Sequence, residues 1–191
     1  MNISHEKSND FDEFLMTQRI GRAASNYIEP KDTIILDSGI ISIEIAKNIA
    51  NTSDITVITN SLGIASELAN KETIHVIIPG GTFDKQSLSF IGSATKETFK
   101  EYFCDKLFLI IDGISSEYGI STRSMEKALL NRTMINTAKE VIVVFESKNF
   151  NTRNLAYIGP ISLVDTIITD HNITEEELNQ LKKFGLQIII A

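Results

Sequence analysis

The sequence has one cysteine, Cys104, and no tryptophan. A single cysteine excludes an internal disulfide and a zinc site built from several thiolates, and such sparing use is typical of a reducing cytoplasm. The apolar runs reach only about five or six residues, far short of the roughly 20 that cross a bilayer. Residues 1–13 lack the basic start and the apolar core of a signal peptide. We therefore expect a cytoplasmic protein with no membrane partner.

Basic residues are in the minority, with 18 Lys and Arg against 25 Asp and Glu and a formal net charge of −7. Nucleic-acid binding needs a surplus of Lys and Arg on one face, so this chain alone is not expected to hold DNA. His5, His75 and His171 are isolated, and no Cys, His and carboxylate spacing predicts a metal site. Motifs for a dinucleotide site, a P-loop and a nucleophile elbow are also missing. The sequence predicts no cofactor and no catalytic residue.

Apolar segments alternate between strand-like runs and helical spacing over most of the 191 residues. Strands are predicted at 33–36, 55–58, 74–78, 106–111, 141–145, 166–168 and 186–190. Helices are predicted at about 14–28, 42–50, 62–69, 94–103, 124–138 and 174–184. Since most strands are continuous apolar runs, helices should cover both faces of the sheet. The expected fold class is a three-layer α/β/α arrangement around a mainly parallel sheet.

The chain is expected to form one folded domain, because no Pro/Gly/Ser-rich linker divides it. Residues 14–191 are assigned to this domain. Residues 1–13 have little apolar content and are assigned to a flexible arm, or to the remnant of a linker. Segments 81–93 and 149–160 are candidates for a small subdomain.

The stretch Asp37-Ser38-Gly39 lies between a predicted strand and a predicted helix. A strand that turns tightly into a helix leaves backbone N–H groups pointing at one spot, beside the positive end of the helix dipole. This arrangement favours an anion. We therefore interpret this turn as the start of a binding site.

Polar or small residues follow each of the predicted strands up to residue 168. Ligands of open parallel sheets bind beyond the carboxyl ends of the strands, so these residues should share one rim. The candidate effector-binding residues are Asp37, Ser38, Gly39, Ser42, Thr59, Asn60, Ser61, Gly80, Gly81, Asp112, Gly113 and Lys148. Lys148 is assigned to a phosphate, and the acids and amide to sugar hydroxyls. Ordinary βα turns are the alternative, because polar and small residues are common in them.

The cluster Arg123, Lys127 and Arg132 lies on the predicted helix 124–138 and just before it. We interpret these three residues as a solvated helix face. They are not included among the candidate site residues.

The rim residues belong to a series of short segments that resembles the C-terminal effector-sensing domain of DeoR-type transcriptional regulators. The segments are Ile20-Gly-Arg-Ala-Ala24, Asp32-Thr-Ile-Ile-Leu-Asp-Ser-Gly39, Val57-Ile-Thr-Asn-Ser61, Pro79-Gly-Gly81, Phe90-Ile-Gly92, Asp105-Lys-Leu-Phe108, Asp112-Gly-Ile114, Gly119-Ile-Ser-Thr122, Ser147-Lys148 and Ile168-Thr-Asp170. The resemblance implies a fold like ribose-5-phosphate isomerase. It also implies a sugar-phosphate effector, a homo-oligomer (dimer or tetramer), and DNA affinity that changes when the effector binds.

The chain departs from the family in two respects. Members carry a winged helix-turn-helix module before this domain, whereas a short acidic stretch stands here. Either that module has been removed or the protein is a stand-alone sensor, and we favour the former.

The family's phosphate loop usually reads Asp-Ser-Gly-Thr-Thr, but Ile40 and Ile41 replace both threonines. Each lost hydroxyl donor removes about 1.5–3 kcal/mol, unless Ser42 and backbone N–H groups compensate.

Two further family positions differ: Asn131 stands for a lysine and Glu146 for an aspartate.

As a whole, the resemblance favours the sensor domain of a repressor of sugar-metabolism genes. One alternative is a sugar-phosphate isomerase with Asp112 or Glu117 as base and Lys148 as cation. However, the denser acidic cluster and Lys-Gly-Gly-Gly loop of that enzyme are missing. The other alternative is an oligomerisation domain whose pocket has degenerated.

Overall fold

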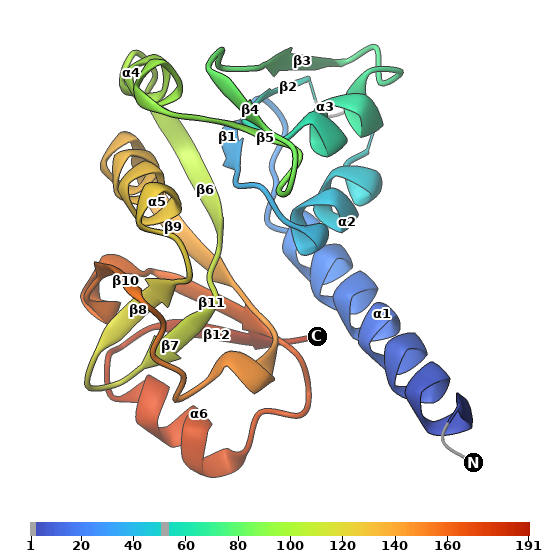
Figure 1. Ribbon diagram of the computed structural model, residues 1–191, viewed down its shortest axis with the longest axis vertical. Coiled ribbons are helices and arrows are strands. Elements are labelled where there is room, and N and C mark those ends of the chain that lie inside the picture. Colours follow the sequence, from blue (N-terminus) through green and yellow to red (C-terminus); the bar gives the residue numbers. More distant parts are fainter. Residues whose placement is uncertain (1–2, 51–53) are drawn as a thin grey trace.

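The centre of the fold is a seven-stranded parallel sheet in the order β12-β11-β9-β6-β1-β2-β3. The structure is a computed structural model that describes the backbone of residues 3–50 and 54–191 and the side chains of 12–50 and 54–191 (Figure 1). The strands are β1 (Thr33–Leu36), β2 (Ile55–Ile58), β3 (Ile74–Ile77), β6 (Cys104–Ile110), β9 (Ala138–Val144), β11 (Thr166–Thr169) and β12 (Gln187–Ile190). Each predicted strand is found, with ends that differ by a few residues at most.

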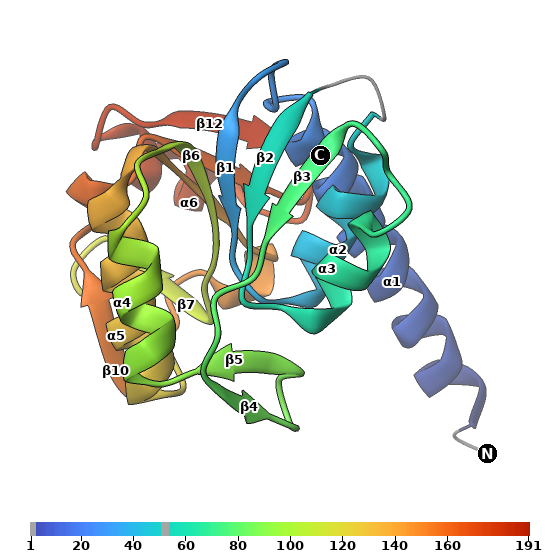
Figure 2. The same cartoon turned by 90° about the horizontal axis from the view of Figure 1, so that it is seen from above.

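Helices cover both faces of this sheet. They are α1 (Ile3–Ser25), α2 (Ile40–Asn48), α3 (Leu62–Leu68), α4 (Ser93–Lys100), α5 (Met125–Thr137) and α6 (Glu175–Lys182). Figure 2 shows α1, α2 and α3 on one side of the sheet and α4 and α5 on the other. The three-layer α/β/α fold class predicted from the continuous apolar strands is confirmed.

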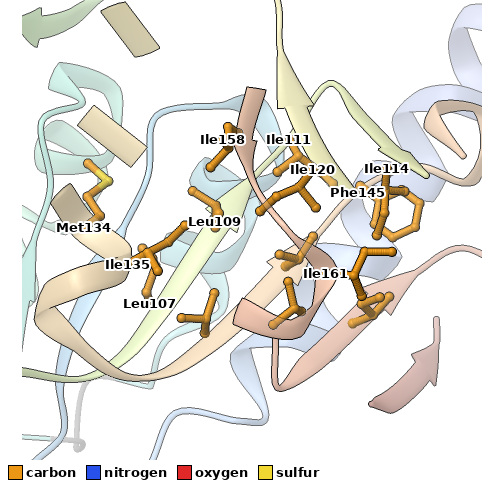
Figure 3. Close-up of a cluster of buried hydrophobic side chains, with 14 of the residues drawn as sticks. Leu107, Leu109, Ile111, Ile114, Ile120, Met134, Ile135, Phe145, Ile158 and Ile161 are labelled. Atoms are coloured by element: carbon orange, nitrogen blue, oxygen red, sulfur yellow. The ribbon is translucent and has the colours of Figure 1, made fainter. Parts of the chain in front are cut away.

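Successive residues of the central strands enter two separate cores, because side chains alternate across a sheet. Ile34 and Phe108 pack with the α1–α3 layer. Ile35 and Leu107 pack with α4–α6 in the larger core, part of which is drawn in Figure 3. Both faces therefore need apolar residues, which explains why these strands do not alternate in sequence.

Two small sheets lie beyond the main one. A three-stranded sheet has the order β10-β8-β7, formed by Ala156–Gly159, Gly119–Thr122 and Gly113–Ser115. A hairpin pairs β4 (Thr82–Asp84) with β5 (Ser89–Ile91). Figure 2 shows this hairpin beyond the carboxyl ends of β1, β2 and β3. None of these five strands is predicted from the sequence: they are short, two begin with glycine, and they lack the continuous apolar runs of the central strands.

Helix α1 begins at Ile3, so the described residues 3–13, assigned from the sequence to a flexible arm or a linker remnant, continue the helix that was predicted from about residue 14. Figure 1 shows the N-terminal half of α1 projecting from the body of the domain. The other half docks on α2, where Gly21 lies directly against Glu44. Once a docked segment has nucleated a helix, adding turns costs little, even for a polar sequence. Among the described residues, no helix combines the length and apolar character needed to cross a membrane.

Candidate functional site

A cavity of about 770 Å³ opens at the carboxyl ends of β1, β2 and β6. The turns after these strands form its floor, the β4–β5 hairpin forms one wall, and the start of α5 forms the other. Its lining residues are Asp37, Ser38, Asn60, Asp84, Gln86, Ser87, Ser89, Ile91, Asp112, Thr122, Arg123, Ser124, Glu126, Lys127 and Leu130. The rim expected from the strand ends therefore carries a concave site whose lining residues are mostly polar or charged.

Asp37 is the most buried acid of this cavity, with 1% of its surface exposed. Its carboxylate accepts hydrogen bonds from Ser38 N (2.8 Å), Ile110 N (3.3 Å) and Asn131 Nδ2 (3.2 Å). Burial raises the pKa of Asp37 above its ordinary value, although Lys127 and these donors act in the opposite direction. Desolvation thus outweighs the local donors.

Asp112 occupies a more open position across the cavity. Its Oδ2 accepts from Thr122 Oγ1 (2.6 Å) and from Arg123 N (3.1 Å). Burial alone would raise the pKa of Asp112, but the Thr122 hydrogen bond and the charges of Lys127 and Arg123 outweigh it and lower that pKa. Asp112 is therefore the more readily ionised of the two acids.

Lys127 lies between these two acids. Its Nζ is 3.9 Å from Asp37 Oδ2, and its charge also acts on Asp112. The side chain is 25% exposed, so the ammonium group can still meet a ligand in the cavity. Arg123 is one helical turn before Lys127 and lines the same wall.

Two buried amides keep an unused acceptor near this floor. Asn60 is 1% exposed, and its Nδ2 donates to Phe90 O (2.9 Å). Asn131 is fully buried and donates to Asp37. In the described part of the chain, the Oδ1 atoms of both amides lack a hydrogen-bond partner. Because an unpaired buried carbonyl is costly, Asn60 Oδ1, which belongs to a lining residue, is suited to a ligand donor.

Four of the candidate residues line the cavity: Asp37, Ser38, Asn60 and Asp112. Several others support its walls instead. Thr59 Oγ1 accepts from Ser61 N, and Ser61 caps α3 by accepting from Ile64 N. These two side chains are buried and fix the turn that presents Asn60.

The four predicted glycines are not among the lining residues of the cavity. Gly39 precedes α2 and packs on the Ile110 side chain. Gly80 O accepts from Thr95 Oγ1 (2.9 Å), while a Cβ on Gly81 would meet Ile91 O at 2.6 Å. At Gly113 a Cβ would lie 2.8 Å from Asn154 Nδ2. The Ser42 hydroxyl is buried within the α2 layer, with no partner among the described side chains.

Lys148 is not among the residues that line the cavity. Its ammonium forms ion pairs with Glu13 of α1 and with Glu146 after β9. Thr17 of α1 also reaches Glu146 Oε1 (3.4 Å). Lys148 thus connects α1 to the sheet, whereas Arg123 and Lys127 are the basic residues in the lining of the cavity.

Arg123, Lys127 and Arg132, which were interpreted as a solvated helix face, are exposed or partly exposed, but they also have roles that this interpretation did not include. Arg123 and Lys127 line the cavity, and Arg132 Nε donates to Ile158 O (3.0 Å), which ties α5 to β10. The available signal was the presence of two basic residues at the predicted start of a helix. Its use required knowing that α5 begins beside the carboxyl ends of the strands. Within residues 12–50 and 54–191, no group of three or more His, Cys, Asp or Glu could hold a metal ion.

A family model, the DeoR C-terminal sensor domain, matches residues 16–171. The chain is 35% identical to a protein of Escherichia coli O157:H7 named "Putative aga operon transcriptional repressor", over 92% of this chain and 65% of that protein. It is 31% identical to the HTH-type transcriptional repressor GlcR of Bacillus subtilis, over 91% of this chain and 66% of GlcR. The chain is 28% identical to the glycerol-3-phosphate regulon repressor of Escherichia coli K12, over 80% of this chain and 61% of that repressor. The chain thus spans slightly less than two thirds of these relatives.

Solved structures with the same fold are distant in sequence. Ribose-5-phosphate isomerase A from Methanocaldococcus jannaschii superposes with a TM-score of 0.51 at 12% identity, over 71% of this chain and 53% of the enzyme. The delta subunit of eIF2B from Chaetomium thermophilum superposes with a TM-score of 0.57 at 18% identity, over 81% of this chain and 55% of that subunit. These likenesses establish the fold expected from the sequence and nothing about activity.

Proposed function

The chain belongs to the DeoR family as a C-terminal sensor domain, and from this premise we propose that it binds a phosphorylated sugar or similar anionic metabolite in the cavity at the strand ends. The observation that carries the proposal is the polar cavity of about 770 Å³, which combines two cationic side chains with acceptors for hydroxyl groups. Cations and helix N-termini suit a phosphate, whereas carboxylates and amides suit sugar hydroxyls.

In the whole protein, we propose that ligand binding modulates DNA binding by a winged helix-turn-helix module that is not part of this sequence. The named relatives are transcriptional repressors, and one is named for the glycerol-3-phosphate regulon. The chain itself carries a net charge of −7, which fits a part of the protein that senses rather than one that holds DNA. A cytoplasmic location belongs to the same proposal.

We also propose that the domain works as a homo-oligomer, a dimer or a tetramer. A second cavity of about 430 Å³ has Tyr118, Leu155, Tyr157 and Phe184 in its lining. Each of these side chains is at least 41% exposed, and Leu155 is 85% exposed. Aromatic residues that surround a hollow are typical of protein interfaces.

The isomerase alternative is not favoured. The relatives are named repressors, and the enzyme shares only the fold. Asp112 is held by Thr122 and Arg123, and Lys148 lies outside the cavity, so the proposed base and cation do not meet. Turnover of ribose 5-phosphate in a coupled assay would reverse this conclusion.

The test of the sensor proposal is a thermal-shift and calorimetry series with ribose 5-phosphate, glucose 6-phosphate, glucosamine 6-phosphate and glycerol 3-phosphate. A ligand at 100 times its Kd should add about 2.7 kcal/mol to the free energy of unfolding. The parent compounds without phosphate are the matched controls and should give a smaller shift. No shift with any phosphate at millimolar concentration would contradict the proposal.

A further inference from the structure

Arg123 and Lys127 lie on one side of the cavity beside Asp112, whose carboxylate accepts from Arg123 N (3.1 Å), whereas Asp37 and Asn60 lie at its floor. Arg123 stands just before Ser124, the N-cap of α5, and Lys127 lies in the first turn of this helix; both residues line the cavity. Ser124 caps this 13-residue helix by accepting from Lys127 N, and the positive end of the helix dipole points the same way. In the described part of the chain, the Arg123 guanidinium forms no hydrogen bond or ion pair.

The floor at the start of α2 has the opposite character. Ser38 N, which could have met an anion, donates to Asp37 Oδ1 (2.8 Å). The next helical positions are Ile40 and Ile41, which have no hydroxyl to offer. Asn60 also lines the cavity and is 1% exposed; its Oδ1 is buried and has no hydrogen-bond partner among the described residues. A phosphate here would meet a carboxylate and a bare carbonyl oxygen, so this side suits hydrogen-bond donors.

Building on the proposed function, we infer that the ligand binds in one orientation, with its phosphate on Arg123, Lys127 and the start of α5, and a hydroxyl or ammonium donor on Asn60 Oδ1. Lys127 is a specificity-determining residue in this arrangement, since it also faces Asp37 and so separates the two sides. The turn at Ser38 then recognises the sugar rather than the phosphate.

The phosphate itself reports on this orientation through its ³¹P chemical shift. A phosphate monoester loses its second proton near pH 6, and two adjacent cations should lower that pKa in the complex. The probe is whichever sugar phosphate of the series binds most tightly. Lys127→Met and Arg123→Gln should each raise the pKa of the bound phosphate and weaken binding roughly 10- to 100-fold. Lys127→Arg should restore both values.

Lys148→Met is the matched control, because this lysine pairs with Glu13 and Glu146 outside the cavity. It should leave the pKa of the bound phosphate unchanged. Melting of each variant without ligand separates loss of binding from loss of folding. If Lys127→Met and Arg123→Gln bind with unaltered affinity and phosphate pKa, the orientation is overturned while the sensor proposal stands.

The acceptor side is tested with deoxy analogues of the same ligand, in the native chain and in Asn60→Ser. For the hydroxyl that contacts Asn60, the native chain should bind the deoxy analogue roughly 3- to 10-fold more weakly than the parent sugar phosphate. The Asn60→Ser variant should bind the analogue and the parent with about equal affinity. The corresponding amino analogue distinguishes an ammonium donor from a hydroxyl donor, since Asn60→Asp should favour it. If no analogue couples to residue 60, the orientation is overturned. If no sugar phosphate binds the native chain at all, the proposed function fails and the orientation fails with it.

Discussion

At the scale of single residues, Asp170 has the most complete set of donors outside the cavity. Its carboxylate accepts from Ser147 N (2.7 Å), Ser147 Oγ (2.7 Å) and Asn172 N (2.9 Å). Burial alone would raise the pKa of Asp170, but the hydrogen bonds from Ser147 and Asn172 outweigh it and lower that pKa. The ionised carboxylate is therefore favoured by folding, and it joins the loop after β9 to the end of β11.

Asp170→Asn should lower the free energy of unfolding by about 1–3 kcal/mol at pH 7, because an amide cannot accept all three donors. A lowered pKa in the folded state stabilises the protein above the ordinary carboxyl value, and this contribution is lost as the pH falls. The difference between variant and native chain should therefore shrink below about pH 4. Urea titrations at several pH values measure it. Glu72→Gln, at an exposed carboxylate, is the control, and a pH-independent difference would contradict the assignment.

At the scale of elements, the contact between α1 and α2 depends on the missing side chain of Gly21. A Cβ there would lie 3.0 Å from the carbonyl carbon of Glu44 and 3.1 Å from Ile45 N. Both are backbone atoms, which cannot rotate away. Helix α2 starts at the cavity floor and α1 projects from the body, so this contact connects the cavity to the projecting helix (Figure 1).

Gly21→Ala should destabilise the domain. Alanine gains about 0.5–1 kcal/mol of helix propensity. Overpacking against a backbone costs about 1–3 kcal/mol, which outweighs that gain. The melting temperature measures the result, and Gly80→Ala is the control because a Cβ there has no atom within 4 Å. A rise in the melting temperature of Gly21→Ala would show that the two helices separate freely.

At the scale of the whole molecule, the exposed residues around the second cavity predict self-association. Glu117 and Arg153 both line this cavity, so a two-fold axis could pair each with the other in a second copy. Sedimentation should give a species larger than the 21.3 kDa chain, and Leu155→Glu should reduce it to that mass. Phe103→Glu, at an exposed residue outside this lining, should leave the assembly intact. A native chain that sediments as a monomer would contradict the prediction.

The cavity shows how much of the candidate site could be predicted from the sequence. Asp37, Ser38, Asn60 and Asp112 could be placed at one rim because each directly follows a buried parallel strand. Arg123 and Lys127 could not, because they follow β8, a four-residue strand in a separate sheet. Lys148 also follows a central strand, yet it turns toward Glu13 of α1, which is more than a hundred residues away in sequence. Strand ends are local features, whereas the direction of a long side chain depends on distant neighbours.

The sequence by itself determined the layers, the parallel sheet and the strand ends at which the cavity opens. Continuous apolar strands must be covered on both faces, and short polar turns must follow them. Only the tertiary structure decided which charges meet in the cavity. A lysine can pair with any carboxylate within reach of its flexible stem, and the packing of α1 and α5 assigned Lys148 to one acidic pair and Lys127 to the cavity.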